Sequence, residues 1–184
     1  LLPQSHIRYS GYTSWRGIVK NTWGIEKAAY EAWGPAGRFG YVPVGQNNIY
    51  WFACKNAPRT SEAMRKMTPG DLAKNFRNYS QPIPSIIEQT TLNEMIWGDI
   101  IDLEPIAQYA FGKLLLIGDA AHATTPNMGQ GACMGVEDAW LVAKKLDEST
   151  GNVEAAFKQF ENERLKRTHY IVNTSYKLGK VAQW

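Results

Sequence analysis

The chain has 184 residues and a net charge of +3, with 44% hydrophobic and 20% charged residues. A charge this small gives no reason to expect a nucleic-acid partner, and no tract is polar enough to predict disorder. No apolar run approaches the length of a membrane span, and two cysteines make neither a metal site nor a disulfide framework, so we expect a reducing, cytoplasmic setting.

The first half of the chain is dominated by strand patterns. Residues 6–20 are rich in β-branched and aromatic side chains and predict one or two strands. Residues 37–55 predict a hairpin around the turn Gly45-Gln46-Asn47-Asn48. Other segments predict short helices and one more strand: helices at 25–33, 68–79 and 83–89, and a strand at 92–101.

The second half predicts a strand, a glycine-rich loop and two helices. The run Lys113–Ile117, ended by Gly118, is typical of a buried strand, often in a parallel sheet. Helices are expected at 132–146 and 153–179. The whole pattern predicts an α+β sheet region with inserted helices over 1–105. That region is joined to the C-terminal strand, loop and helices of an α/β domain over 106–184.

The loop GDAAHATTPNMGQGACMG, residues 118–135, has the spacing of neither a phosphate loop nor a dinucleotide fingerprint. Gly118 would place Asp119 at the carboxyl end of the preceding strand, where open α/β sheets bind ligands. A carboxylate there can accept hydrogen bonds from ligand hydroxyls. Similar turns occur in α/β proteins that bind no ligand, so spacing alone leaves the function of the loop open.

Three further features of the loop suit a flat ligand that carries a partial negative charge. Pro126 stiffens the chain, while Gly129 and Gly131 remove side chains where a ring could approach the backbone. The helix that begins near Ala132 offers free N–H groups and the positive end of its dipole.

The same residues resemble the second FAD-binding motif of the class A flavoprotein monooxygenases, the aromatic-ring hydroxylase-like family with the para-hydroxybenzoate hydroxylase fold. That motif runs GDAAH, Pro, GQG and then EDA before a leucine-rich helix. This chain has Gly118–His122, Pro126, Gly129–Gly131 and Glu137–Ala139 in that order. The strands of the first half resemble the urate hydroxylase and zeaxanthin epoxidase branch.

The resemblance implies FAD as cofactor and NAD(P)H as co-substrate. Asp119 would bind the ribityl hydroxyls, and Pro126 would lie beside the reactive edge of the isoalloxazine. The implied reaction is hydroxylation or epoxidation of a small aromatic or apolar substrate through a flavin C4a-hydroperoxide, which requires no catalytic side chain and no metal. The implied cofactor-binding residues are Gly118, Asp119, Pro126, Gly129, Gln130, Gly131, Ala132 and Cys133.

In such a protein the region 1–105 would be a substrate-binding sheet domain, and 106–184 would be part of the FAD-binding domain. Strand alternation lets only some aromatic residues of the sheet face a substrate. Arg16 could bind an anionic group, although an exposed strand arginine is the plainer interpretation. The candidates for the substrate pocket are Tyr12, Trp15, Arg16, Tyr41 and Trp51, with Tyr50 and Phe52 beside them.

The family also binds the ADP half of FAD through an N-terminal GxGxxG motif, which this sequence lacks. The chain therefore resembles the C-terminal part of such an enzyme. Two alternatives stay open: a non-catalytic module that sequesters a ligand, and a fragment that is inert without its N-terminal half. We further expect a local structural role for His122, and a solvated helix face for Arg164, Lys166 and Arg167.

Overall fold

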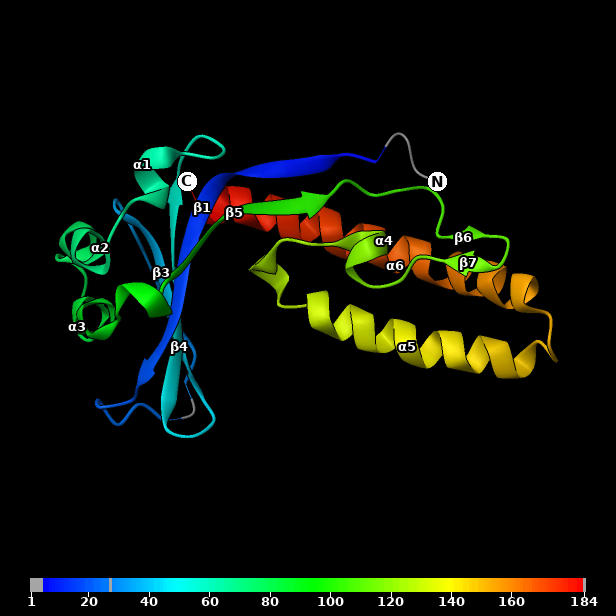
Figure 1. Cartoon of the computed structure of the whole chain (residues 1–184), viewed down its shortest axis with the longest axis horizontal. Coiled ribbons are helices and arrows are strands. Elements are labelled where there is room, and N and C mark those ends of the chain that lie inside the picture. The colour runs from blue at the N-terminus through cyan, green and yellow to red at the C-terminus, as the bar shows by residue number, and fades with distance from the viewer. Residues whose placement is uncertain (1–4, 27, 184) are drawn as a thin grey trace. The chain divides into compact units, whose positions relative to one another are not determined.

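The computed structural model describes residues 5–26 and 28–183, which form two compact units (Figure 1). The sheet unit comprises the described residues of Gly11–Ile100 together with Ala182 and Gln183. The helical unit comprises Ile101–Val181 together with residues 5–10. The expected mixed class, an antiparallel sheet combined with helices, is confirmed.

A five-stranded sheet in the order β2-β3-β4-β1-β5 is the centre of the sheet unit. Strands β1 and β4 pair antiparallel from Tyr12↔Asn56 to Lys20↔Asn48. The predicted hairpin is confirmed as β3 and β4, with Gln46 and Asn47 in the left-handed backbone that a tight turn needs. The strands are β1 Ile7–Lys20, β2 Tyr30–Gly34, β3 Gly37–Val44, β4 Asn48–Asn56 and β5 Ile96–Leu103.

The helix expected at 25–33 is wrong. Tyr30–Gly34 is strand β2, paired antiparallel with β3 from Tyr30↔Tyr41 to Gly34↔Gly37. The Tyr30 and Tyr41 rings stack with centroids 5.2 Å apart. Cross-strand pairing and stacking thus override the weak helical pattern of this segment, as tertiary context often does. Gly34 ends a strand rather than a helix.

The core of the sheet unit lies between the sheet and its helices α2 and α3, which Figure 1 shows on one face of the strands. Trp15, Phe39 and Trp51 have no exposed surface and pack with Leu72, Phe76, Ile86 and Ile87. A capping box between Thr68 and Asp71 starts α2, at the place where the sequence predicts a helix to begin. The helices are α1 Glu62–Arg65, α2 Pro69–Phe76 and α3 Ile83–Gln89. The helices predicted at 68–79 and 83–89 are thus confirmed, and α2 ends three residues before the predicted end.

The strand expected at 92–101 begins later than predicted. Leu92–Glu94 form the 3-10 turn η1, and β5 starts at Ile96. Thr91 and Glu94 form a second capping box, which satisfies the local backbone donors and delays the strand.

The helical unit is built from two helices and short connecting elements. Helices α5 Gly131–Glu148 and α6 Val153–Ala182 confirm the two predicted helices. Its core contains Ile106, Tyr109, Ala121, Leu141 and Phe160. The short elements are β6 Ala110–Phe111, β7 Leu114–Leu115, α4 Asp119–His122 and η2 Pro126–Met128. Among the described residues, no helix is both long and apolar enough to cross a membrane.

The buried, parallel strand expected at 113–117 is wrong in two respects. Only Leu114–Leu115 are strand, and they pair antiparallel with β6. Leu114 is 44% exposed and Ile117 is 40% exposed, so the described chain covers them only in part. An apolar run predicts a buried strand only where another element packs on it.

The β2–β3 turn gives a sharp stability test at Gly37. Its φ is +127°, and a Cβ there would lie 2.0 Å from the carbonyl oxygen of Cys54. We predict that Gly37→Ala lowers the free energy of unfolding by roughly 2 kcal/mol or more, because the backbone of β4 must move. Urea unfolding measures this. The control Gly45→Ala, where a Cβ meets nothing within 4 Å, should change stability by less than about 0.5 kcal/mol, and an equal loss in both variants would contradict the prediction.

Candidate functional site

The glycine-rich loop of the helical unit surrounds a hollow of about 630 Å³. The structure brings six of the eight predicted cofactor residues together at its wall: Gly118, Asp119, Pro126, Gly129, Gly131 and Ala132. Gln130 and Cys133 are not among the lining residues. Thr124, Thr125 and Gly135 also line the hollow, and we did not predict them because they carry no charge and no distinctive spacing.

Three glycines leave the wall of this hollow bare. Gly118 has φ +56° and Gly129 has φ +63°, backbone conformations that glycine adopts most readily. A Cβ built on Gly118, Gly129 or Gly135 would meet no other atom within 4 Å. The backbone therefore faces open space that a flat ligand can occupy closely.

Two polar groups at the wall lack protein partners. The side chain of Asp119 is exposed, and it has no hydrogen bond or ion pair within the described residues. The hydroxyl oxygen of Thr124 is buried and also has no partner there. Since buried polar atoms are nearly always hydrogen-bonded, the Thr124 hydroxyl suits a ligand that carries hydroxyls, and the exposed carboxylate of Asp119 can accept hydrogen bonds from the same ligand.

The N-terminus of α5 borders the same hollow at Gly131 and Ala132. The side chain of the N-cap residue, Gln130, does not bond to the helix end. The first N–H groups of a helix have no intrahelical acceptor, and they carry the positive end of the helix dipole. This 18-residue helix thus offers stabilisation to a partial negative charge on a ligand.

The middle of the loop is tied to α6 by a buried chain of hydroxyls. The Ser175 hydroxyl donates to the Thr125 carbonyl oxygen at 2.6 Å, and the two side-chain oxygens lie 2.8 Å apart. The Asn127 amide donates to the Thr125 hydroxyl at 3.0 Å and to the Ser175 carbonyl at 2.9 Å. These contacts fix the loop on both sides of Pro126.

The start of the loop is tied to α5 by the carboxylate of Asp138, which has no exposed surface. Its Oδ2 accepts the Gly118 N–H at 2.8 Å and lies 2.7 Å from His122 Nε2. Burial would raise the pKa of the Asp138 carboxyl, but the hydrogen bonds from His122 and Gly118 and the charge of Arg164 hold it below its ordinary value. His122 is buried and its partner is Asp138, which is the arrangement that the expected structural role requires.

Arg164 corrects the expectation of a solvated basic face. It is only 4% exposed, and its Nε donates to Asp138 Oδ1 at 2.7 Å. Its Nη1 donates to Glu137 at 2.6 Å. Hydrogen bonds from Arg167 and Arg164, acting against burial, lower the pKa of Glu137 to about 2. Lys166 and Arg167 are exposed. Sequence gave no signal for this pairing because the partners lie 26 or more residues apart.

The structure places the predicted substrate residues in different surroundings. Trp15 and Trp51 lie in the core beneath α2 and α3, and Tyr12 packs with Phe52, Cys54 and Ile100. These three side chains (Tyr12, Trp15 and Trp51) have no exposed surface. Tyr41 packs on the core and stacks on Tyr30. Tyr12, Trp15 and Trp51 therefore stabilise the sheet and have no surface that a ligand can contact, whereas Tyr41 is half-buried.

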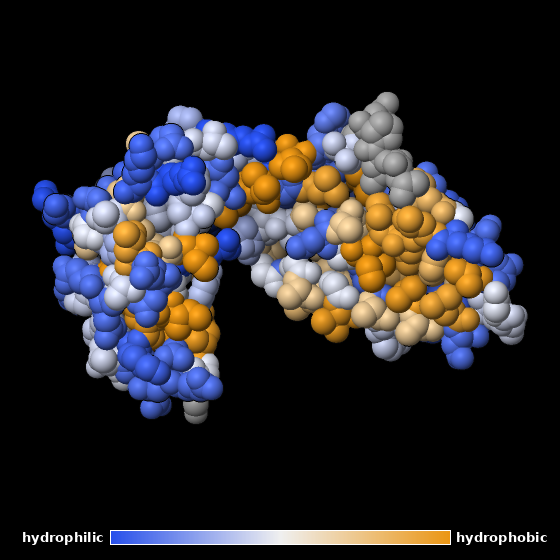
Figure 2. All heavy atoms as spheres, in the orientation of Figure 1, coloured by the Kyte–Doolittle hydropathy of each residue, from blue (hydrophilic) through white to orange (hydrophobic). Residues whose placement is uncertain are grey.

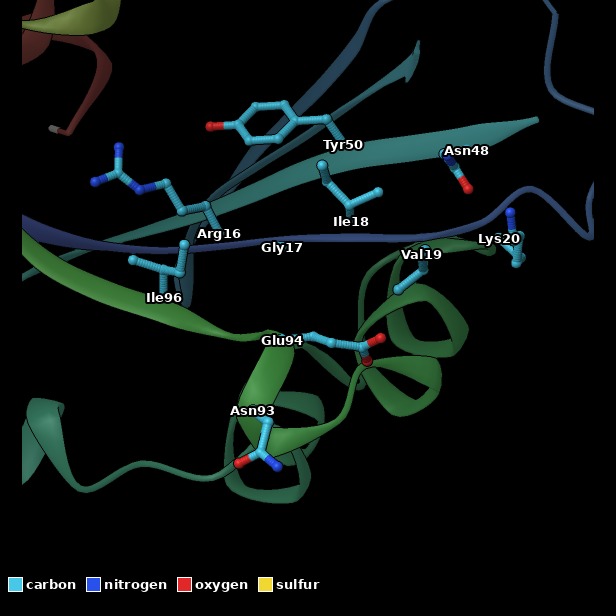
Figure 3. Close-up of a pocket in the computed structure, with 10 residues that line it drawn as sticks. All are labelled: Arg16, Gly17, Ile18, Val19, Lys20, Asn48, Tyr50, Asn93, Glu94 and Ile96. Atoms are coloured by element: carbon cyan, nitrogen blue, oxygen red, sulfur yellow. The ribbon is translucent and has the colours of Figure 1, made fainter. Parts of the chain in front are cut away.

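Arg16 lines a separate hollow of about 520 Å³ in the sheet unit, together with Tyr50 (Figure 3). Arg16, Ile18 and Lys20 alternate along β1 on its exposed face, and Tyr50 is the β4 partner of Ile18. Ile18 is 52% exposed. The remaining lining residues are Gly17, Val19, Asn48, Asn93, Glu94 and Ile96.

The two cations of this hollow are free to bind an anion. Neither Arg16 nor Lys20 has an ion-pair partner within the part of the chain that the structure describes. The Glu94 carboxylate is held by the N–H and hydroxyl of Thr91, at 3.1 and 2.6 Å. The hollow therefore combines apolar surface with two cations that have no ion-pair partner in the described residues, Arg16 and Lys20, and one carboxylate, Glu94.

Known proteins resemble this chain in both sequence and structure. The family described as FAD binding domain matches residues 14–175. The chain is 40% identical to aurachin C monooxygenase/isomerase of Stigmatella aurantiaca, across 100% of this chain and 48% of that protein. It is 32% identical to 2-heptyl-3-hydroxy-4(1H)-quinolone synthase of Pseudomonas aeruginosa, across 99% of this chain and 48% of that protein.

A solved structure of an FAD-containing protein also matches this chain. HpxO of Klebsiella pneumoniae, complexed with FAD and uric acid, matches with a TM-score of 0.90 and 26% identity. The match covers 98% of this chain and 46% of that one, so the chain spans about half the length of the relatives it matches. Matched over most of its length, this chain belongs to the FAD-binding class A flavin monooxygenases, whose cofactor is FAD.

Proposed function

We propose that this chain is the C-terminal part of an FAD-dependent monooxygenase that uses NAD(P)H and O₂ to hydroxylate or epoxidise a small aromatic or apolar molecule. The observation that carries the proposal is the glycine-lined hollow of 118–135, which presents the unpaired carboxylate of Asp119. A surface of this kind suits the ring and the hydroxylated chain of a flavin better than it suits phosphate.

Different residues of the hollow bind different parts of FAD. Asp119 accepts hydrogen bonds from ribityl hydroxyls, and the Thr124 hydroxyl supplies a further polar contact. The N-terminus of α5 stabilises negative charge on the ring system. Gly118, Gly129 and Gly135 keep side chains out of its way. When bound, FAD supplies the redox chemistry with NAD(P)H and O₂, so the protein needs no nucleophile or metal of its own.

We further propose that the substrate binds at the hollow beside Arg16. The names of relatives support a flat, nitrogen-containing ring, since one is a quinolone synthase and another structure contains uric acid. Ile18 and Tyr50 offer apolar contact, while Arg16 and Lys20 would bind an anionic or strongly polar oxygen of the substrate.

The helical unit has exposed apolar surface, which is evidence that further parts of the protein pack against it. Figure 2 shows hydrophobic side chains gathered over β6, β7 and α5. Leu114, Val136 and Trp140 are 44%, 71% and 64% exposed. Patches of this kind usually mark an interface, and we propose that further parts of the protein cover it. We therefore expect the isolated chain to be inactive, and we propose a cytoplasmic location for the whole enzyme.

The flavin site is tested by Asp119→Ala in the full-length protein. Loss of its hydrogen bonds should raise the dissociation constant for FAD by roughly fivefold or more. The measurement is a fluorescence titration of the FAD-free protein with FAD. Asp147→Ala, an exposed aspartate farther along α5, should leave the constant unchanged. A wild-type protein that takes up no FAD, or an Asp119→Ala variant that binds it as the wild type does, would contradict the proposal.

The substrate site is tested by Arg16→Gln in the same protein. Steady-state NAD(P)H oxidation stimulated by 2-heptyl-4-quinolone and by uric acid should show KM raised by roughly tenfold for the accepted compound, because a charged hydrogen bond is lost. The FAD dissociation constant should not change. Arg59→Gln is the control, an exposed arginine of the same unit outside the hollow. Equal KM values in the wild type and Arg16→Gln would rule out this placement.

A further inference from the structure

We propose that Asp138 is a positioning residue for FAD binding, and that it acts by holding the turn that presents Asp119. The inference rests on the proposed function, because it concerns how the flavin site is built. Asp138 itself does not line the hollow.

One carboxylate oxygen of Asp138 binds both ends of the turn. Oδ2 accepts the N–H of Gly118, the residue before α4, and contacts the ring of His122, the last residue of α4. Asp119 lies between these two points. The carbonyl of Gly118 is held as well, by the N–H groups of Ala121 and His122 at 2.9 Å each. The peptide groups around Asp119 are therefore fixed from both sides.

The turn needs this external support because α4 is too short to hold itself. It has four residues, and no side chain caps its N-terminus. Gly118 has φ +56° and ψ −141°, and a glycine loses more conformational freedom on folding than any other residue. Without the Asp138 contact, nothing in the described chain would accept the Gly118 N–H.

The second carboxylate oxygen connects the turn to α6. Oδ1 accepts Arg164 Nε at 2.7 Å, and Arg164 Nη2 donates to the Met134 carbonyl at 3.2 Å. Gly118 N–H and Arg164 are donors by their chemistry, and a neutral or charged His122 can donate from Nε2 as well. The site thus demands an ionised carboxylate. An asparagine of the same shape must point its own NH₂ at one of these donors.

Glu161 provides a matched control for a merely structural role. It is also a carboxylate of the helical unit, 2% exposed, and accepts the N–H groups of Tyr109 and Ala110 at 2.7 and 2.9 Å. Its loop does not line the flavin hollow. Removing its charge should destabilise the unit without moving Asp119.

The test is a double-mutant cycle on FAD binding in the full-length protein. We expect Asp138→Asn to raise the FAD dissociation constant by roughly tenfold or more. In the Asp119→Ala background the same change should have a much smaller effect, because no carboxylate remains to be positioned. Glu161→Gln should lower the urea midpoint, leave the FAD constant unchanged and combine additively with Asp119→Ala.

Equal fold-changes for Asp138→Asn in both backgrounds, or equal effects of Asp138→Asn and Glu161→Gln on FAD binding, would overturn the inference. If Asp138→Asn does not fold, Arg164→Lys completes the cycle, since it keeps the charge but loses the Nε contact. Non-additivity with Asp119→Ala is again expected, and additivity would overturn the inference. A wild type without FAD uptake would refute the proposed function itself, whereas a weakened Asp119→Ala variant with an additive cycle would refute this inference alone.

Discussion

The geometry of the helical unit depends on the hydrogen bonds that the buried carboxylate of Asp138 accepts. This carboxylate joins three segments that are distant in sequence: the turn at Gly118, helix α5 and Arg164 on α6. Burying a carboxylate and a guanidinium costs several kcal/mol, which only a fully hydrogen-bonded arrangement offsets. Removing one partner typically costs about 3–5 kcal/mol because it leaves the other charge unpaired. The arrangement is therefore sensitive to any loss within it.

Helix α6 serves as the support for the loops around the hollow. Glu161, Arg164, Thr168 and Ser175 are all buried, and their spacing of three, four and seven residues places them on one face of the helix. Each contacts a different part of the unit. Glu161 accepts from the Tyr109–Ala110 backbone, and Arg164 donates to Asp138. Thr168 bonds to the Tyr109 hydroxyl, and Ser175 bonds to Thr125. Within this stripe of polar side chains, Arg164 and Ser175 fix the loop where FAD binds, whereas Glu161 and Thr168 hold Tyr109 and Ala110, and α6 contributes no residue to the wall of the hollow.

Local signals in the sequence predicted much of this structure. Glycine and asparagine in the β3–β4 turn, the helix start at Thr68–Asp71 and the spacing of the two long helices each act through neighbouring residues. The motif at 118–135 likewise named six of the residues that line one hollow, although Gln130 and Cys133 do not line it. The failures concern distant partners. Tyr30–Gly34 becomes a strand because β3 pairs with it. Leu114 stays partly exposed because the described chain covers only part of it. Arg164 is buried because Asp138 and Glu137 receive it.

Amide hydrogen exchange in the FAD-free full-length protein measures whether Asp138 holds the Gly118 N–H. We expect the Gly118 amide to be protected in the wild type. In Asp138→Asn it should exchange faster by roughly tenfold or more, while the amides of Tyr109 and Ala110, held by Glu161, keep their protection. A Gly118 amide that exchanges equally fast in both proteins would contradict the account.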